Sequence, residues 1–386
     1  MRIGLVVEQF DPRRGGLEQW TAQFAQRMAQ RGHEVHVAAC RFGPQVAEWP
    51  ILRHPLEGVR SRLSFAEAAE QTMRPLALDV VHDMGAGWYC DVFQPHGGSR
   101  RAVDEHNLLL WPAWMRPAKR TINRWLPRHR EFEILMARQY VSDGRILLAL
   151  SQRVAADFRQ RHGVAAEQIR VIPNGVDTER FTPDNRPVWR EAIRYRLGVD
   201  EDTLLLFIAA HNFPLKGVPM LLRAMRRLTR ERRRVHLLDA GGKRLRGANR
   251  AAARLGVASA VTFIGPVEDT APLYAAADVY VQPTFYDPCS LVVLEALGAG
   301  LPVITTRYNG VSELLTDGVD GCVLDDPADL DGFLARLEPL FSPAVRQPMS
   351  RGARQLALQH TLDRNCDEIE AVYREVAAVR RRDQAA

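Results

Sequence analysis

The stretch PTFYDPCSLVVLEALGAGLPVITT contains two acids, Asp287 and Glu295, with seven residues between them. A Pro-Cys-Ser turn separates an apolar strand from a run of helical character. The backbone N–H groups of Cys289, Ser290 and Leu291 could therefore bind a phosphate at the positive end of a helix dipole. Glu295 could reach a ribose hydroxyl beside that phosphate, and Asp287 could reach sugar hydroxyls on the other flank. For an isolated pair, the alternative is a capping aspartate and a solvated glutamate.

Further candidate residues stand where parallel strands are expected to end. Lys216, in HNFPLKG, begins a helix, where a positive charge is unfavourable unless it meets an anion such as a leaving diphosphate. Gly15 and Gly16 follow the first strand and permit close approach of a phosphate, although a plain turn explains them equally well. His96 precedes two glycines that fit a tight turn, although a lone histidine is more often structural. We predict His96, Lys216 and Asp287 to be catalytic, and Gly15 and Gly16 to bind the donor.

These residues must be positioned by alternating strands and helices. Strands are expected at 2–7, 34–39, 79–84, 90–94, 145–150 and 168–173, and then at 203–210, 235–242, 261–266, 278–283 and 302–306. The alternation predicts an α/β protein with two doubly wound, Rossmann-like domains facing a cleft. We place these domains at 1–180 and 190–362, with the proline-bearing segment 181–189 as a linker. The last helix, 363–386, could pack back on the first domain.

Composition limits the classes of function. The chain of 386 residues is 46% hydrophobic, which is typical of a globular protein, and it has no apolar run long enough to span a membrane. The N-terminal segment MRIGLVVEQF reads as a strand rather than a signal peptide, so we expect a cytoplasmic protein. The five cysteines are scattered, with no metal-ligand spacing, which favours reduced thiols. The net charge of +6 favours an anionic partner.

The motifs together resemble the retaining glycosyltransferases of family 4, which have the two-domain GT-B fold. The run DPCSLVVLEALGAGLPVITTRYNGVSELL is similar to the family's paired-acid segment, and VIPNGVDTERFTP to the segment before its linker. DPRRGGLEQW resembles its first glycine loop, and HNFPLKG its phosphate-binding lysine loop. The four segments occur in family order. The resemblance implies a nucleotide-sugar donor, held mainly by the C-terminal domain, and retention of anomeric configuration without a cofactor or a metal ion.

The resemblance also implies roles for single residues. His96 would lie beside the transferred sugar, and Lys216 would stabilise the leaving diphosphate. Three positions depart from the family pattern. His211 stands where many relatives have an arginine, and Leu215 stands where core glucosyltransferases have an arginine directly before the lysine. Asp287 replaces the usual glutamate and is one methylene shorter. We include His211 among the donor-binding residues.

Within the family, the glycine loop and the basic segment 111–139 are most similar to bacterial lipopolysaccharide-core α-glucosyltransferases. This segment interleaves tryptophans with basic residues, listed here: Trp111, Trp114, Trp125, Arg116, Lys119, Arg120, Arg124, Arg128 and Arg130. Tryptophan suits a membrane interface and basic side chains suit anionic head groups. We therefore predict peripheral contact with the inner face of the cytoplasmic membrane. The alternative is a helix pair packed through its tryptophans, and nucleic acid fits poorly.

The predicted activity is hexose transfer, with a UDP-sugar as the favoured donor, to a lipopolysaccharide core or another glycolipid. Three alternatives stay open. The acceptor could be a different polysaccharide or a small molecule. The same fold also serves a sugar-nucleotide epimerase, although no additional acid pair for that reaction is evident. The departures at Asp287 and His211 would also suit a non-catalytic binder of sugar nucleotides.

Overall fold

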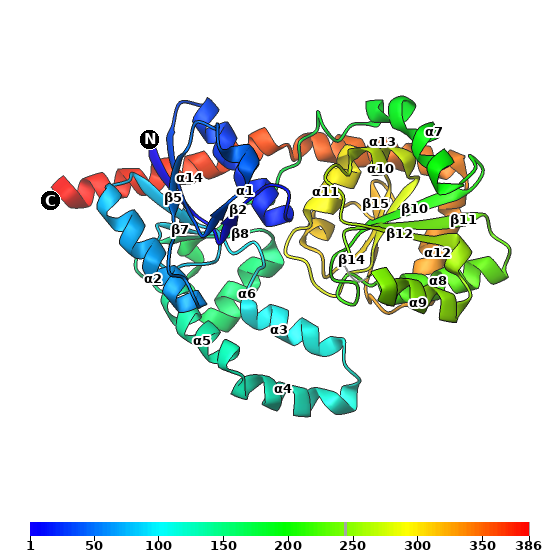
Figure 1. Ribbon diagram of the computed structural model, residues 1–386, viewed down its shortest axis with the longest axis horizontal. Coiled ribbons are helices and arrows are strands. Elements are labelled where there is room, and N and C mark those ends of the chain that lie inside the picture. The colour runs from blue at the N-terminus through cyan, green and yellow to red at the C-terminus, as the bar shows by residue number, and fades with distance from the viewer. Residues whose placement is uncertain (243–244, 386) are drawn as a thin grey trace. The chain divides into compact units, whose positions relative to one another are not determined.

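The computed structural model describes residues 1–242 and 245–385, without the side chains at 124, 128 and 381–385 (Figure 1). The chain forms two compact units. The first unit comprises residues 1–174 together with 362–386, and the second comprises 175–361. No helix in the described part of the chain is both long and apolar enough to cross a membrane.

The first unit is built on a parallel sheet of seven strands in the order β5-β3-β1-β6-β7-β8-β9. Its strands are β1 Arg2–Val6, β3 Glu34–Ala39, β5 Leu52–Pro55, β6 Val80–Asp83, β7 Val92–Phe93, β8 Ile146–Ala149 and β9 Ile169–Val171. Two further short strands, β2 Gln9–Phe10 and β4 Arg41–Phe42, follow β1 and β3 in the sequence and pair with each other in a separate two-stranded sheet. The order changes direction around β1, so the carboxyl ends of β1 and β6 form the point where ligands bind in such sheets.

Seven described helices belong to the first unit: α1 Gly16–Gln30, α2 Arg62–Met73, α3 Arg100–Leu109, α4 Arg116–Trp125, α5 Pro127–Gln139, α6 Gln152–His162 and α14 Leu362–Ala385. Helix ends follow local signals. At α6, for example, the Ser151 hydroxyl accepts the Val154 N–H at 3.3 Å, and Gly163 ends the helix with φ of 69°. In Figure 1, α3, α4 and α5 form an arm that extends from the sheet.

The last helix, α14, packs on the first unit, where it contacts α1 and β6 (Figure 1). Its buried Tyr373 lies 2.6 Å from Nδ1 of His82, which is itself fully buried. Near its start, the Asn365 amide donates to the carbonyl of Pro173 at 2.7 Å. Since an apolar helix face needs a partner surface, these contacts explain why the chain returns to the first unit after residue 361.

The second unit contains a parallel sheet in the order β12-β11-β10-β13-β14-β15. Its strands are β10 Leu204–Ala209, β11 Val235–Ala240, β12 Val261–Gly265, β13 Val279–Gln282, β14 Val303–Thr306 and β15 Gly321–Leu324. Its described helices are α7 Arg186–Leu197, α8 Val218–Arg230, α9 Leu245–Leu255, α10 Ala271–Ala276, α11 Leu291–Gly298, α12 Leu330–Leu337 and α13 Pro343–Gln359. Nearly every residue of the central strands is buried, as expected for strands covered on both faces. The predicted α/β class with two doubly wound sheets is therefore confirmed.

The predicted linker at 181–189 is wrong, because the units divide between residues 174 and 175 and this segment is part of the second unit. A short 3-10 turn, Pro183–Asn185, leads into α7. Each of these two elements has a proline in its first turn, where a backbone N–H has no intrahelical partner. The prolines of this segment therefore mark helix starts and not an extended linker.

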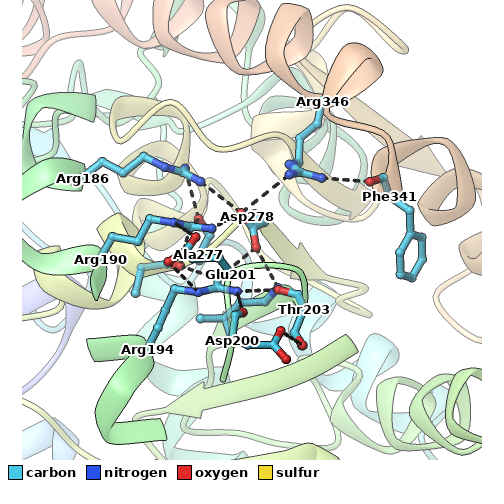
Figure 2. Close-up of polar contacts among 12 residues, drawn as sticks. Arg186, Arg190, Arg194, Asp200, Glu201, Thr203, Ala277, Asp278, Phe341 and Arg346 are labelled. Atoms are coloured by element: carbon cyan, nitrogen blue, oxygen red, sulfur yellow. Dashed lines mark hydrogen bonds and ion pairs between the residues drawn. The ribbon is translucent and has the colours of Figure 1, made fainter. Parts of the chain in front are cut away.

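Helix α7 is fixed to the sheet by a cluster of arginines around Asp278 (Figure 2). The Asp278 side chain is 2% exposed and lies directly before β13. Arg186 and Arg190 bind its Oδ1 at 3.0 and 3.1 Å, and Arg194 binds its Oδ2 at 3.2 Å. These arginines repeat every fourth residue, so they share one face of α7. Burial alone would raise the pKa of Asp278, but the arginines and the Leu205 N–H lower it below its usual value.

A second buried carboxyl in this unit, Asp239 on β11, has its pKa shifted in the opposite direction. It is 0% exposed, and neither oxygen has a hydrogen-bond partner among the residues that the structure describes. Burial raises the pKa of Asp239 to about 8. The side chain is therefore neutral in the folded protein at pH 7, whereas it is ionised in the unfolded chain, whose ordinary pKa is 3.8.

This difference predicts that Asp239 makes stability depend on pH. Between about pH 4 and pH 8 the folded state holds a proton that the unfolded state releases, so stability falls as pH rises, by up to about 1.4 kcal/mol per pH unit. Asp239→Asn removes this dependence. The unfolding free energy of the variant relative to the wild type should rise by about 2–3 kcal/mol from pH 5 to pH 7, as measured by urea unfolding. An unchanged difference at the two pH values would contradict the prediction.

Candidate functional site

The paired-acid turn connects the carboxyl end of β13 with α11 and is held firmly by backbone bonds. The Asp287 N–H donates to the Tyr308 carbonyl at 2.9 Å, and the Gly310 N–H donates to the Asp287 carbonyl at 2.8 Å. Asp287 does not cap α11, because Ser290 is the residue at the N-cap. The capping alternative for Asp287 is therefore wrong.

The start of α11 presents only some of the backbone donors expected there. The helix supplies no acceptor for the N–H groups of its first turn, Leu291, Val292 and Val293. The Ser290 N–H, in contrast, donates to the side-chain oxygen of Asn309 at 3.3 Å. Ser290 and Cys289 are both buried. A phosphate at this helix start would first meet the amides of Leu291 and the residues after it, because the Ser290 amide already has an acceptor. Donor binding by Cys289 and Ser290 stays a prediction.

Lys216 lies beside Asp287, although 71 positions separate them in the sequence. Its Nζ contacts Oδ2 of Asp287, and both side chains are 12% exposed. The lysine loop is tied to the turn after β13, since the Leu215 carbonyl accepts from the Phe285 N–H at 2.8 Å and from the Thr284 hydroxyl at 3.0 Å. Gly217 has φ of +79°, and a Cβ there would lie 2.2 Å from the Pro283 carbonyl oxygen. Only glycine permits this close approach.

His211 is near this pair but is exposed. Partial burial lowers its pKa, and the Lys216 cation lowers it further, while the Asp287 carboxylate acts in the opposite direction. His211 is therefore a mainly neutral hydrogen-bonding group at pH 7, and it does not replace the charge of an arginine.

Glu295 is buried within the second unit, so the alternative of a solvated helix residue is wrong. It is 9% exposed, and its Oε2 accepts the Tyr274 hydroxyl at 2.9 Å. Burial raises the pKa of Glu295 to about 7, although the Tyr274 hydrogen bond and the nearby Arg180 cation lower it. A carboxyl that is partly protonated at pH 7 could accept or donate a hydrogen bond to a ribose hydroxyl.

The other predicted residues lie in the first unit. Gly15 is the N-cap of α1 and Gly16 is its first residue. The buried Trp20 of the same helix packs on His96, with ring centroids 4.5 Å apart. Burial lowers the pKa of His96 to about 3, so this imidazole is neutral at ordinary pH. A neutral His96 could exchange hydrogen bonds with sugar hydroxyls but could not provide a positive charge.

The glycine loop of the first unit is not an entirely positive environment. A Cβ on Gly15 would lie 3.0 Å from Oε2 of Glu18, so this carboxyl folds back over the start of α1. Burial raises the pKa of Glu18, and the neighbouring Glu8 and Asp11 also raise it. Phosphate binding at Gly15 and Gly16 stays a prediction that rests on their backbone amides.

Two residues that organise the turn, Gln282 and Asn309, were not predicted from the sequence. The Gln282 side chain donates to Asp287 and Ser290, and Asn309 accepts the N–H groups of Ser290 and Val311. A signal for Gln282 was present, because it is a polar residue at the end of an otherwise apolar strand, directly before the turn. No such signal existed for Asn309, since only the fold brings it to the turn.

The basic aromatic segment exposes its tryptophans, so the alternative of a helix pair packed through them is wrong. Trp114 is 80% exposed and Trp125 is 71% exposed. Ile122 is 56% exposed and lies three residues before Trp125, so these two side chains share one face of α4, whereas Trp114 belongs to the short 3-10 turn before that helix, Ala113–Met115. Lys119 instead lies over the ring of Trp111, at 5.0 Å. The predicted basic side chains at 124 and 128 lie outside the described residues.

In the described residues no group of three or more His, Cys, Asp or Glu side chains is placed to hold a metal ion. The second unit instead brings Lys216, from the loop after β10, next to Asp287, in the turn that leads into α11. A lysine and free helix amides attract a phosphate, and the carboxylate accepts hydrogen bonds from hydroxyls. The arrangement is thus able to bind a sugar joined to a phosphate and to stabilise negative charge on that phosphate.

Comparison with protein-family models gives two matches that together span most of the chain. The model described as "Glycosyltransferase Family 4" matches residues 14–180, and the model described as "Glycosyl transferases group 1" matches residues 202–342. The chain is 30% identical to a D-inositol 3-phosphate glycosyltransferase of Geodermatophilus obscurus, over 93% of this chain and 84% of the relative. It is 33% identical to the Saccharomonospora viridis protein of the same name, over 94% of this chain and 90% of that relative.

Other similarities are to proteins with different names. The lipopolysaccharide glucosyltransferase WaaG of Escherichia coli is 32% identical over 47% of this chain and 49% of the relative. The crystal structure of a WaaG superposes with a TM-score of 0.81 at 22% identity, covering 96% of this chain and 99% of that one. The structure of Anabaena HepE with UDP-glucose superposes with a TM-score of 0.75 at 19% identity, and the match covers 97% of this chain and 100% of that one. At these identities the structural matches establish the fold.

Proposed function

The chain belongs to glycosyltransferase family 4, and we propose that it transfers a hexose, with retention, from a nucleotide-diphosphate sugar to a lipopolysaccharide-core or other glycolipid acceptor. The observation that carries the donor proposal is the contact of Lys216 with Asp287 beside the start of α11. A UDP-sugar is the favoured donor, which the UDP-glucose bound by HepE supports. The enzyme would work at the inner face of the cytoplasmic membrane.

In this proposal the second unit stabilises the departing group. The acceptor hydroxyl oxygen forms a bond to the anomeric carbon on the face from which the diphosphate leaves. The bond between that carbon and the diphosphate breaks, and the hydroxyl proton passes to the diphosphate oxygen. Lys216 and the first-turn amides of α11 neutralise the charge that develops on the diphosphate. Asp287 accepts a hydrogen bond from the donor sugar, and Glu295 binds the ribose. We assign no metal ion and no protein nucleophile.

The donor proposal is tested by thermal unfolding with UDP-, GDP-, ADP- and dTDP-sugars. A ligand at 100 times its Kd stabilises the native state by about 2.7 kcal/mol, which should raise the midpoint by several degrees. We expect one nucleotide series to produce this shift in the wild type, and Glu295→Ala to abolish it. The exposed Glu231→Ala is the matched control and should retain the shift. If no donor shifts the wild type, the donor site in the second unit is refuted.

The membrane proposal rests on the exposed tryptophans of α4 and the 3-10 turn before it. Replacing Trp114 and Trp125 together by serine should weaken binding to vesicles with anionic lipids at least about tenfold, because each large apolar side chain contributes about 1.5–3 kcal/mol when buried. Sedimentation with vesicles measures this affinity. Trp189→Ser, at a half-exposed tryptophan of α7, is the control and should bind as the wild type does. Equal vesicle affinity of the double variant and the wild type would exclude α4 as the docking surface.

A small-molecule acceptor is the second candidate, and the names of the two inositol-phosphate relatives support it. Product analysis distinguishes the two acceptors. Transfer from the donor to inositol 3-phosphate, but not to a lipopolysaccharide core, would favour the small acceptor. Transfer to the lipid-linked acceptor alone would favour the first proposal.

A further inference from the structure

The amide of Gln282 joins the two ends of the donor turn in the second unit. Gln282 is the last residue of β13 and is 0% exposed. Its Nε2 lies 3.2 Å from Oδ2 of Asp287 and 3.1 Å from the Ser290 hydroxyl. One buried side chain therefore contacts both the first acid of the pair and the N-cap of α11.

The orientation of this amide follows from its other partner, Tyr280. The Tyr280 hydroxyl accepts the Ala209 N–H at 3.3 Å and lies 2.9 Å from Oε1 of Gln282. An amide oxygen only accepts, so the Tyr280 O–H must donate to it. The two N–H donors of the amide are then directed away from Tyr280, toward Asp287 and Ser290. Tyr280 is 0% exposed, so water does not compete for this bond.

These contacts place the Asp287 carboxylate in one orientation. In the described part of the chain, Oδ2 of Asp287 receives both Lys216 and the Gln282 amide, which leaves Oδ1 to accept a hydrogen bond from a ligand. Asp287 is one methylene shorter than glutamate and has fewer rotamers of its own. A second donor on Oδ2 fixes the direction of Oδ1, which Lys216 alone would not do, because an ammonium on a flexible stem has no fixed geometry.

We propose that Gln282 is a positioning residue for the donor sugar: it holds Asp287 so that Oδ1 faces a sugar hydroxyl. The inference rests on the proposed transferase function, and it assigns the sugar half and the nucleotide half of the donor to different residues. Gln282 acts on the sugar half of the donor through Asp287. The nucleotide half depends on the start of α11 and on Glu295, whose hydrogen bond goes to Tyr274 rather than to Gln282.

Gln282→Met tests the proposal, because methionine has a similar size and shape but no amide. We expect kcat/KM for transfer to fall about 10- to 100-fold, as for the loss of one hydrogen bond to a charged group. Affinity for UDP without a sugar, measured by calorimetry, should stay within about twofold of the wild type. A purely structural defect would weaken the binding of UDP and of the UDP-sugar alike, and that result would overturn the proposal.

A rescue variant provides a second test that does not depend on the stability of Gln282→Met. If Gln282 compensates for the short acid, adding Asp287→Glu to Gln282→Met should restore kcat/KM by about threefold or more, because the longer acid reaches further without the amide. Absence of rescue would overturn the proposal. Tyr280→Phe, which frees the amide to turn, should give a smaller loss in the same direction, and wild-type kcat/KM in this variant would count against the fixed orientation.

The control variant is Thr262→Val, which removes a partly buried hydrogen bond between the Thr262 hydroxyl and His236 at 2.9 Å, away from the turn. It should leave kcat/KM unchanged. The outcome also separates this inference from the proposed function. A wild type that neither binds nor transfers any nucleotide sugar refutes both. A wild type that transfers the sugar while Gln282→Met does so equally well refutes only the role of Gln282.

Discussion

Replacing Lys216 by alanine is expected to lower kcat for hexose transfer by about a thousandfold, the upper range for loss of one group that stabilises developing charge. Lys216 is the cation that contacts Asp287 in the donor turn, and His211 beside it is mainly neutral at pH 7. Stabilisation of the negative charge that develops on the diphosphate therefore depends on Lys216 and on the start of α11. The measurement is steady-state transfer with the nucleotide sugar that stabilises the wild type.

The separate effects of Lys216→Ala on kcat and on KM show which role Lys216 has. If it stabilises the departing diphosphate, kcat and kcat/KM should fall together. A variant with normal kcat and a raised KM would show that Lys216 only holds the donor. Arg223→Ala is the control for loss of a positive charge, because Arg223 is exposed on α8 of the same unit. It should retain wild-type kinetics.

Asp278→Ala is expected to reduce the unfolding free energy by about 3–5 kcal/mol, the cost of leaving buried cations without their partner. Arg194 has 2% of its side chain exposed and Arg190 has 15%, and both bind Asp278 (Figure 2). The Leu205 N–H would also lose its acceptor, at 2.9 Å in the native protein. Urea unfolding of the full chain measures the loss.

An exposed ion pair of the same unit provides the comparison for Asp278→Ala. Asp202 binds Arg234 at 3.0 Å, and both side chains are largely in solvent. Asp202→Ala should cost at most about 1 kcal/mol. Similar losses from the two variants would show that burial does not determine the contribution of the Asp278 cluster.

Asp278 and Gln282 lie at opposite ends of one strand, β13. Asp278 precedes β13 and anchors α7, whereas Gln282 ends β13 and contacts the donor turn. In doubly wound sheets, ligands bind beyond the carboxyl ends of strands, which leaves the amino ends to serve stability. Substitutions at the two ends of β13 should therefore have separable effects, on unfolding free energy at Asp278 and on donor use at Gln282.

Local patterns in the sequence were sufficient to predict the fold class and the strand-to-helix connection that forms the donor turn. Strands such as Leu204–Ala209 are continuous apolar runs, and such runs need cover on both faces, which implies a parallel sheet between helices. The end of β13 was also predictable, because Pro283 directly follows Gln282 and a proline has no N–H to donate within a sheet. Both signals are local, so neighbouring residues are sufficient to produce them.

Which side chains come into contact, and which are buried, could be seen only in the folded chain. Asp287 contacts Lys216 because β10 and β13 are neighbours in the sheet, and that order is not visible in the sequence. Segment 181–189 looked like a linker, yet the arginines of α7 bind Asp278 about ninety residues later. Glu295 is buried although an isolated glutamate on a helix is usually solvated, and the exposure of Trp114 was visible only in the folded chain, because the same residues could also form a helix pair packed through its tryptophans. The physical reason is that burial and pairing depend on long-range packing, whereas strand and helix formation depend largely on nearby residues.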